Sequence, residues 1–401
     1  MTMDVGVPID LHQSALIAAA SVVVSAVSFA TILRDAWRVV PVRIVAACVA
    51  AYLVAVHARW AWGMYLESWP IAHEASIWAV VGLLPITLVA WSLPVAGLVW
   101  QLLRPRPHRV VAAATDDARP LVTRRQVAKA AASTVPLVAL GTAGRGYSSG
   151  LRLPEVRPIP LAFPGLHSDL HGLTILHLSD LHLGFVRQTR HLEATLERLT
   201  VRPDLVVLTG DVADDLNQLE RALRAVKALS PRLGVFSSLG NHEYLHDAPF
   251  ARAAHRRAGV PLLVGDGASI AVGKTTLHVG GADDPVELHG DIGAFMHRTV
   301  AAAMRGAPKD AFRLLLSHRP EGFVPGALHG AHLTLSGHTH GGQIGFNGKS
   351  AFEPIWSERY LWGSFRRGTS RLYTTSGFGH WFPFRVGCPA EVPLITLGPA
   401  R

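Results

Sequence analysis

The stretch LTILHLSDLHLG, residues 173–184, decides how the second half of the chain folds. Its apolar run stops at Ser179, and Asp180 and His182 follow directly. A short apolar run bounded by polar residues predicts a strand that is buried on both faces. Residues two apart on an extended chain point the same way, so Asp180 and His182 are placed to meet in one small volume.

The same pattern returns several times between this stretch and the end of the chain. The runs DLVVLTG, GVFSSLG, FRLLLS and AHLTLSG predict further strands, and helical patterns at 188–201, 216–229 and 249–258 alternate with them. Strands alternating with helices predict an α/β domain over residues 172–401, with the sheets covered on both faces.

Polar side chains follow these predicted strands at the points where the strands end. They are Asp211, Asn241, His242, His318, His338 and His340. The carboxyl ends of strands are where open α/β sheets bind ligands. Carboxylate and imidazole without thiolate suit Mn, Fe, Co or Zn better than calcium. These side chains are more ligands than one metal ion needs. Two metal ions bridged by one carboxylate would use all of them, and such a metal pair is common in enzymes that hydrolyse phosphate esters.

Together the segments DLH (180–182), GDVAD (210–214), GNHE (240–243), SH (317–318) and GHTH (337–340) resemble the calcineurin-like metallophosphoesterase family. The forms LSDLHLG and GHTHGGQ, with apolar segments upstream, are similar to its membrane-anchored bacterial members. The resemblance covers about residues 172–398. It implies a four-layer α/β/β/α sandwich of two mixed sheets flanked by helices.

The resemblance also implies a role for each motif residue. Asp180, His182 and His340 would hold the first metal, Asp211 would bridge both metals, and Asn241, His318 and His338 would hold the second. His242 would be the catalytic residue that steadies the phosphate and protonates the leaving oxygen. The implied activity is that of a metal-dependent phosphoric ester hydrolase with two divalent ions, Mn, Fe or Zn, and a metal-activated hydroxide. No substrate-binding residue is identified.

Residues 1–150 have a different, strongly apolar texture and predict a membrane domain. Apolar segments at 14–33, 42–66, 77–103 and 126–145 predict about four transmembrane helices. The segment 151–171, with several prolines, predicts an extended linker to the catalytic domain. Two cysteines, Cys48 and Cys388, exclude a disulfide framework and a cysteine metal site.

The distribution of basic residues predicts the topology of these segments. The net charge of +9 owes much to the basic stretch at 104–129, so it indicates membrane topology and not nucleic-acid binding. The positive-inside rule puts residues 104–125 in the cytoplasm. If residues 126–145 cross the membrane, the catalytic domain is extracytoplasmic. The segment TRRQVAK (123–129) also resembles a twin-arginine export signal. We therefore predict an integral protein of the bacterial cell membrane.

Three further features leave alternatives open. Asp283 and Asp284 either line the pocket of the predicted metal site or form a turn before Pro285. Asp214 and Asp215 fit a role at a helix N-terminus better than metal ligation. A C-terminal aromatic set forms either a cap facing a membrane or amphiphilic substrate, or a core cluster: Trp356, Tyr360, Trp362, Phe365, Phe378, Trp381, Phe382 and Phe384.

The predicted function is hydrolysis of phosphomonoester or phosphodiester bonds by a membrane-anchored enzyme, with lipid-linked phosphates as one substrate class. One alternative is a hydrolase of soluble nucleotide phosphodiesters. Another is a non-catalytic membrane sensor or assembly factor that keeps the fold. The sequence does not define the physiological substrate or the oligomeric state.

Overall fold

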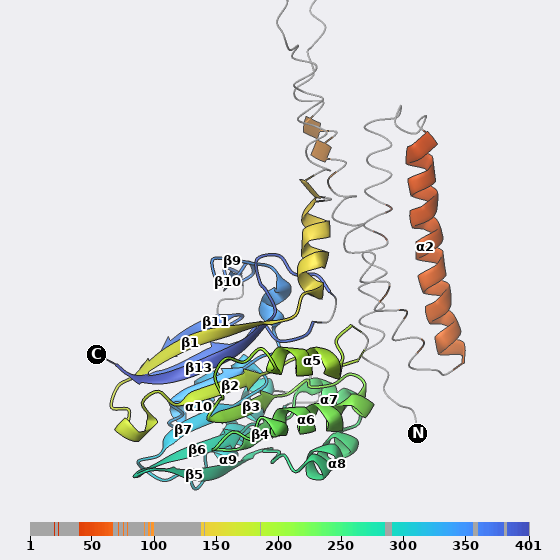
Figure 1. The fold of residues 1–401 in the computed structure, drawn as a ribbon. Coiled ribbons are helices and arrows are strands. Elements are labelled where there is room, and N and C mark those ends of the chain that lie inside the picture. Colours follow the sequence, from red (N-terminus) through yellow and green to blue (C-terminus); the bar gives the residue numbers. More distant parts are fainter. Residues whose placement is uncertain are drawn as a thin grey trace, which may run out of the picture. The chain divides into compact units, whose positions relative to one another are not determined.

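The structure is a computed structural model that describes residues 40–66, 141–184, 186–284, 291–355, 360–380 and 383–400, with scattered residues between 20 and 139. The chain divides into two compact units, residues 1–147 and 148–401 (Figure 1).

In the first unit the main described element is the helix α2, Val40–Tyr65. It coincides with the segment 42–66 that we predicted as a transmembrane helix. Across the described residues, no helix combines the length and the apolar character needed to cross a membrane. Most residues of the predicted segments 14–33, 77–103 and 126–145 lie outside the described residues.

One sheet of the second unit has five strands in the order β1-β13-β2-β3-β4. Their bounds are β1 Glu155–Phe163, β13 Glu391–Pro399, β2 Thr174–Leu178, β3 Leu205–Thr209 and β4 Val235–Ser238. All neighbours are parallel except β13 and β2. Alternate residues of β2 face opposite sides, so Ile175 and Leu176 join different apolar clusters. The opening stretch is therefore a strand that is buried on both faces, as predicted.

The other large sheet has six strands in the order β11-β12-β8-β7-β6-β5. Their bounds are β11 Gly363–Arg367, β12 Ser370–Thr374, β8 Leu333–Ser336, β7 Phe312–Leu316, β6 Thr275–Gly281 and β5 Asp266–Val272. The four inner strands are parallel, and the outer strands β5 and β11 are antiparallel to their neighbours. A hairpin of β9 (Gly345–Phe346) and β10 (Lys349–Ser350) follows β8.

Helices cover the outer face of each sheet, as Figure 1 shows. The first sheet carries α5 Thr189–Leu196, α6 Leu219–Ala228, α7 Asn241–His246 and α8 Ala248–Ala258; the second carries α9 Ile292–Ala303 and α10 Phe323–Leu328. One apolar cluster fills the space between the sheets, and two others lie under the helices. The order of layers is helix, sheet, sheet, helix, which confirms the predicted four-layer sandwich.

The Pro-rich segment that we expected to be part of a linker at 151–171 contains the strand β1. Residues 155–163 form an edge strand parallel to β13. Glu155 donates its N–H to the carbonyl of Ala390, which leads into β13, and N–H directions alternate along a strand. Pro158 and Pro160 therefore face away from β13, where a missing N–H costs no ladder hydrogen bond. An edge strand and a free extended linker share the same sequence pattern here, and pairing with β13 decides between them.

Candidate metal centre

The motif residues converge where the carboxyl ends of the two sheets meet. Asp180 and His182 follow β2, Asp211 follows β3, and Asn241 begins α7 after β4. From the other sheet, His318 follows β7, and His338 and His340 follow β8. The sheets are joined directly at this edge, because the backbone N–H of His338 donates to Asp180 Oδ1 at 2.9 Å.

Asp180, His182 and His340 form one cluster, with one ligand atom from each lying within 4.8 Å of the others. His340 Nε2 is 3.6 Å from Asp180 Oδ1 and 3.2 Å from His182 Nε2. Burial and the neighbouring His182 hold the pKa of His340 well below its usual range, so its ring is neutral. Asp180 Oδ2 is buried and has no hydrogen-bond partner among the described residues. A buried carboxylate oxygen beside imidazole nitrogens suits a divalent cation.

The second cluster consists of Asp211, His318 and His338. His318 Nε2 lies 3.2 Å from Asp211 Oδ2, 3.1 Å from His338 Nδ1 and 3.1 Å from Asn241 Oδ1. Burial alone would lower the pKa of His318, but the charge of Asp211 raises it to about 10. The negative charge of Asp211 that stabilises a proton on His318 would also attract a metal cation.

Asp211 belongs to the second cluster and also approaches the first. Its Oδ2 atom is 3.2 Å from His318 Nε2 in one cluster and 3.8 Å from His182 Nε2 in the other. Burial would raise the pKa of Asp211, but the nearby histidines His318 and His242 hold it well below the usual range, so the group is a carboxylate. This is the position that a bridging ligand needs.

The backbone at the centre is held in an unusual conformation. Asp180, His182, Asp211, His338 and His340 all have positive φ, between 45° and 68°. Such left-handed residues cost about 1–3 kcal/mol each when they carry a side chain, and they persist only where surrounding contacts determine them. The centre is therefore built at a cost in stability.

Glu243 supplies part of that support. Its buried carboxylate accepts the backbone N–H groups of Asp211, Val212 and Gly240 at 2.9, 2.7 and 2.8 Å. The loops after β3 and β4 are thereby tied together. They also approach closely, because a Cβ on Gly210 (φ +82°) would lie 2.3 Å from the nitrogen of Gly240. Glycine is required at that contact.

Asp214 does not have the helix-terminal role that we expected. Its Oδ1 atom accepts hydrogen bonds from His182 Nδ1 at 3.0 Å and from His242 Nδ1 at 2.8 Å. Its neighbour Asp215 is the residue that caps the short helix Leu216–Gln218. A carboxylate on Nδ1 fixes the ring so that Nε2 faces the clusters. Only the fold brings these side chains together, since 28 residues separate Asp214 from His242.

The backbone N–H of His242 donates to Asp211 Oδ1 at 2.9 Å, but its imidazole is not within hydrogen-bond distance of that carboxylate. Its Nε2 atom lies 4.0 Å from Asp211 Oδ2. Burial would lower the pKa of His242, but Asp211 and Asp214 raise it to about 9. The imidazole therefore carries a proton near neutral pH and points toward the space beside both clusters.

Asp284 and Arg319 form a buried ion pair that the sequence did not predict. Arg319 Nε donates to both carboxylate oxygens of Asp284 at 3.1 Å, and Arg319 Nη1 lies 2.8 Å from His338 Nε2. Burial raises the pKa of Asp284 to about 7. The pair braces the ring of His338 from the side opposite to His318. Asp284 is therefore more than a turn residue before Pro285.

Three of the aromatic residues near the C-terminus belong to the interior. Trp362, Phe378 and Phe384 are buried, and Trp362 donates its indole N–H to Glu391. The cap that we considered is therefore wrong for these three. Trp356, Trp381 and Phe382 lie outside the described residues.

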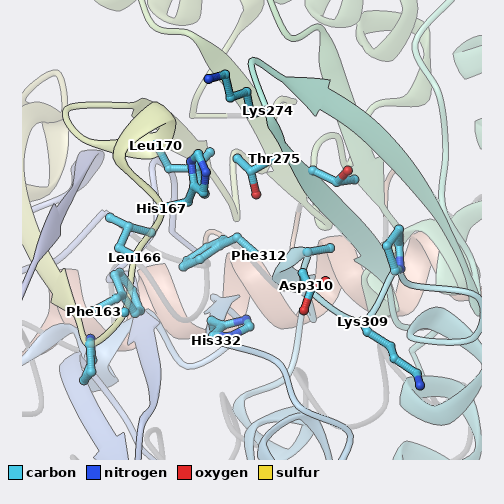
Figure 2. A pocket seen from close by; sticks show the side chains of 15 residues that line it. Phe163, Leu166, His167, Leu170, Lys274, Thr275, Lys309, Asp310, Phe312 and His332 are labelled. Carbon is cyan, nitrogen blue, oxygen red and sulfur yellow. The ribbon is translucent and has the colours of Figure 1, made fainter.

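A cavity of about 580 Å³ lies away from the metal residues. Figure 2 shows the side chains that line it, among them Phe163, Phe312 and His332. Phe312 begins β7 and His332 precedes β8, so the cavity lies at the opposite edge of the sheet from His318 and His338. It is not part of the metal centre.

Comparison with known proteins agrees with the geometry. The family model described as calcineurin-like phosphoesterase matches residues 173–342. An uncharacterized metallophosphoesterase of Aquifex aeolicus is 31% identical over 235 residues, 56% of this chain and 85% of that protein. The chain belongs to the metallophosphoesterase family, which places it among the metal-dependent phosphoric ester hydrolases.

Two other relatives differ in how much of the chain they match. The phosphodiesterase YaeI of Escherichia coli is 27% identical over 289 residues, covering 69% of this chain and 100% of that protein. The bovine transmembrane protein with metallophosphoesterase domain is 27% identical over 375 residues, covering 87% of this chain and 79% of that protein. The chain spans only 65% and 69% of curated relatives from Campylobacter jejuni and Helicobacter pylori.

Proposed function

We propose that this protein is a membrane-anchored phosphoesterase with a dinuclear metal centre, which hydrolyses phosphomonoester or phosphodiester bonds. The observation that carries the proposal is the position of Asp211 Oδ2, which lies 3.2 Å from His318 Nε2 in one cluster and 3.8 Å from His182 Nε2 in the other.

The residues present fit two divalent ions. Asp180, His182 and His340 would hold the first ion, Asp211 would hold both, and Asn241, His318 and His338 would hold the second. Oxygen and imidazole ligands suit Mn, Fe or Zn. Two such ions, when bound, would supply charge neutralisation at the phosphate oxygens and a nucleophilic water of lowered pKa.

The chain's own contribution to proton transfer is His242. Asp214 holds its Nδ1 atom at 2.8 Å, which leaves Nε2 directed toward the clusters. Burial lowers the pKa of His242, whereas the carboxylates of Asp211 and Asp214 raise it, and this favours a protonated imidazole that is able to donate to the leaving oxygen. A protonated imidazole also attracts the phosphate anion before the reaction.

Membrane anchoring is supported by the apolar composition of residues 1–150 and by the match over 87% of this chain to a bovine relative named as a transmembrane protein. The E. coli relative is named a phosphodiesterase, and this favours diesters as substrates. An anchored enzyme meets phosphates at the bilayer surface, so we propose phospholipid or lipid-linked phosphates, with the catalytic unit on the extracytoplasmic side.

The purified full-length protein, reconstituted with Mn, Fe or Zn, tests the proposal with a panel of soluble and micellar phosphate esters. Asp211→Asn is expected to abolish hydrolysis, and His242→Ala to reduce it by about 10²–10⁴-fold. Hydrolysis that survives both changes unaltered would overturn the catalytic assignment. A reporter fused after residue 150 that is active only in the cytoplasm would overturn the proposed topology.

A further inference from the structure

A segment beside the metal centre exposes large apolar side chains. Residues 344–355, the rim segment, contain the β9–β10 hairpin and the turn after it. Phe346 keeps 77% of its surface exposed and Ile355 keeps 70%, and Ile344 is also exposed. Lys349, at the start of β10, is exposed beside them. Exposed aromatic and aliphatic residues next to a basic one are typical of surfaces that enter the headgroup region of a bilayer.

The rim segment has a fixed base close to the metal ligands. It starts four residues after His340. Gly345 donates its N–H to the carbonyl of Val386 at 2.8 Å, and Gln343 Nε2 donates to the carbonyl of Phe384 at 2.6 Å. The rim segment is therefore anchored on residues 383–387.

The same residues 383–387 also hold the point at which the chain enters the catalytic unit. A Cβ on Gly150 would lie 2.3 Å from the carbonyl carbon of Pro383 and 2.6 Å from the nitrogen of Phe384. The buried side chain of Arg187 donates to the carbonyls of Gly150, Leu151 and Arg152, with 2.9 Å to that of Gly150. The entry point is thus fixed by packing and by hydrogen bonds.

The length of chain before Gly150 limits how far the rim segment can be from a membrane. The predicted span 126–145 ends five residues before Gly150. Five residues reach at most about 18 Å when extended, and about 8 Å as a helix. Residues 141–151 are helical. If residue 145 lies at the edge of the bilayer, Gly150 lies about 8 Å from that edge along the helix, together with Pro383 and Phe384, which pack against Gly150. The rim segment starts from the neighbouring residues 384–386.

We infer that the rim segment dips into the bilayer that anchors the chain, with Phe346 and Ile355 among the lipid headgroups and Lys349 facing their phosphates. The inference rests on the proposed membrane anchoring. It names the substrate class of the same site: phosphate esters presented by lipids at the bilayer surface, which reach the metal centre past a segment that begins four residues from His340.

Fluorescence quenching tests the contact directly. The full-length protein carrying Cys48→Ser is reconstituted in phosphatidylcholine–phosphatidylglycerol vesicles, leaving Cys388, which is buried. The environment-sensitive dye NBD is attached at Phe346→Cys or Ile355→Cys. The control is Val201→Cys, which is exposed just before β3 and so lies at the opposite edge of the sheet. Spin-labelled lipid is expected to quench the dye at 346 and 355 but not at 201. Equal quenching at all three positions overturns the inference.

A second measurement detects variants that are merely misfolded. Replacing Phe346 and Ile355 by Ser is expected to lower hydrolysis of vesicle phosphatidylglycerol by about tenfold or more and to leave hydrolysis of bis(p-nitrophenyl) phosphate unchanged. An equal loss on both substrates overturns the lipid-specific role.

The outcomes separate this inference from the proposed function. If the wild-type protein hydrolyses no ester, the phosphoesterase proposal fails, while the quenching still decides the contact. If the wild-type protein does not float with vesicles, both the anchoring and the inference fail.

Discussion

Replacing Asp214 by Asn tests whether one carboxylate positions both His182 and His242. The carboxylate accepts from the two Nδ1 atoms at 3.0 and 2.8 Å, and Asn keeps a neutral acceptor of similar shape. Charge-assisted hydrogen bonds contribute about 1.5–3 kcal/mol and are roughly twice as strong as neutral ones, so the change weakens the two together by about 1.5–3 kcal/mol. We expect kcat/KM to fall by about 10- to 150-fold.

The pH dependence gives a second readout of the same change. Burial lowers the pKa of His242, and Asp211 and Asp214 together raise it to about 9. Removing the charge of Asp214 lowers that pKa. The proton donor is then lost at a lower pH, so the alkaline limb of the kcat/KM profile moves to lower pH in the Asp214→Asn variant.

The matched control is Asp215→Asn, one residue further along. Asp215 is exposed and caps the helix Leu216–Gln218 without contacting the histidines. The assay measures hydrolysis of bis(p-nitrophenyl) phosphate from pH 6 to 9.5 at saturating Mn, with Mn affinity determined in parallel. A wild-type rate and an unmoved alkaline limb in Asp214→Asn, or equal losses in both variants, would refute the reasoning.

Three further predictions concern stability and metal binding. Glu243→Gln leaves at least one of three backbone N–H donors without an acceptor. We expect this to lower the free energy of unfolding by about 2–4 kcal/mol, measured as a lower unfolding temperature. An unchanged unfolding temperature would contradict the bracing role of Glu243. Burial lowers the pKa of His177 to about 3, so the unfolded chain gains a proton below pH 6.5 that the folded chain does not. Stability should fall by about 1.4 kcal/mol per pH unit from pH 6.5 toward pH 3 in denaturant titrations, and His177→Gln should reduce that slope. Chelation should lower the unfolding temperature of the metal-loaded protein, because a ligand at 100 times its Kd adds about 2.7 kcal/mol, and Asp211→Asn should remove this difference.

Much of the catalytic unit could be predicted from local sequence. Apolar runs that end at polar residues, as in LTILHLSDLHLG, predict buried strands because the solvent-free faces of a sheet tolerate only such side chains. The residues after each run then lie at one edge of the sheets by geometry alone. The local sequence therefore predicts that Asp180, His182, Asp211 and His340 gather at this edge.

Only the tertiary structure decided the contacts between segments far apart in the chain. Asp214 reaches His182 and His242, and Arg319 lies between Asp284 and His338, because separate strands end at the same edge. The Pro-rich segment pairs with β13, more than 200 residues away, and becomes a strand. Exposure was also decided there: Trp362 is buried, whereas Phe346 is open. The sequence by itself determined which chemistry gathers at this edge, since strand pattern and ligand type are local properties. Packing determined which polar and apolar side chains surround it, since burial depends on neighbours that only the folded chain brings together.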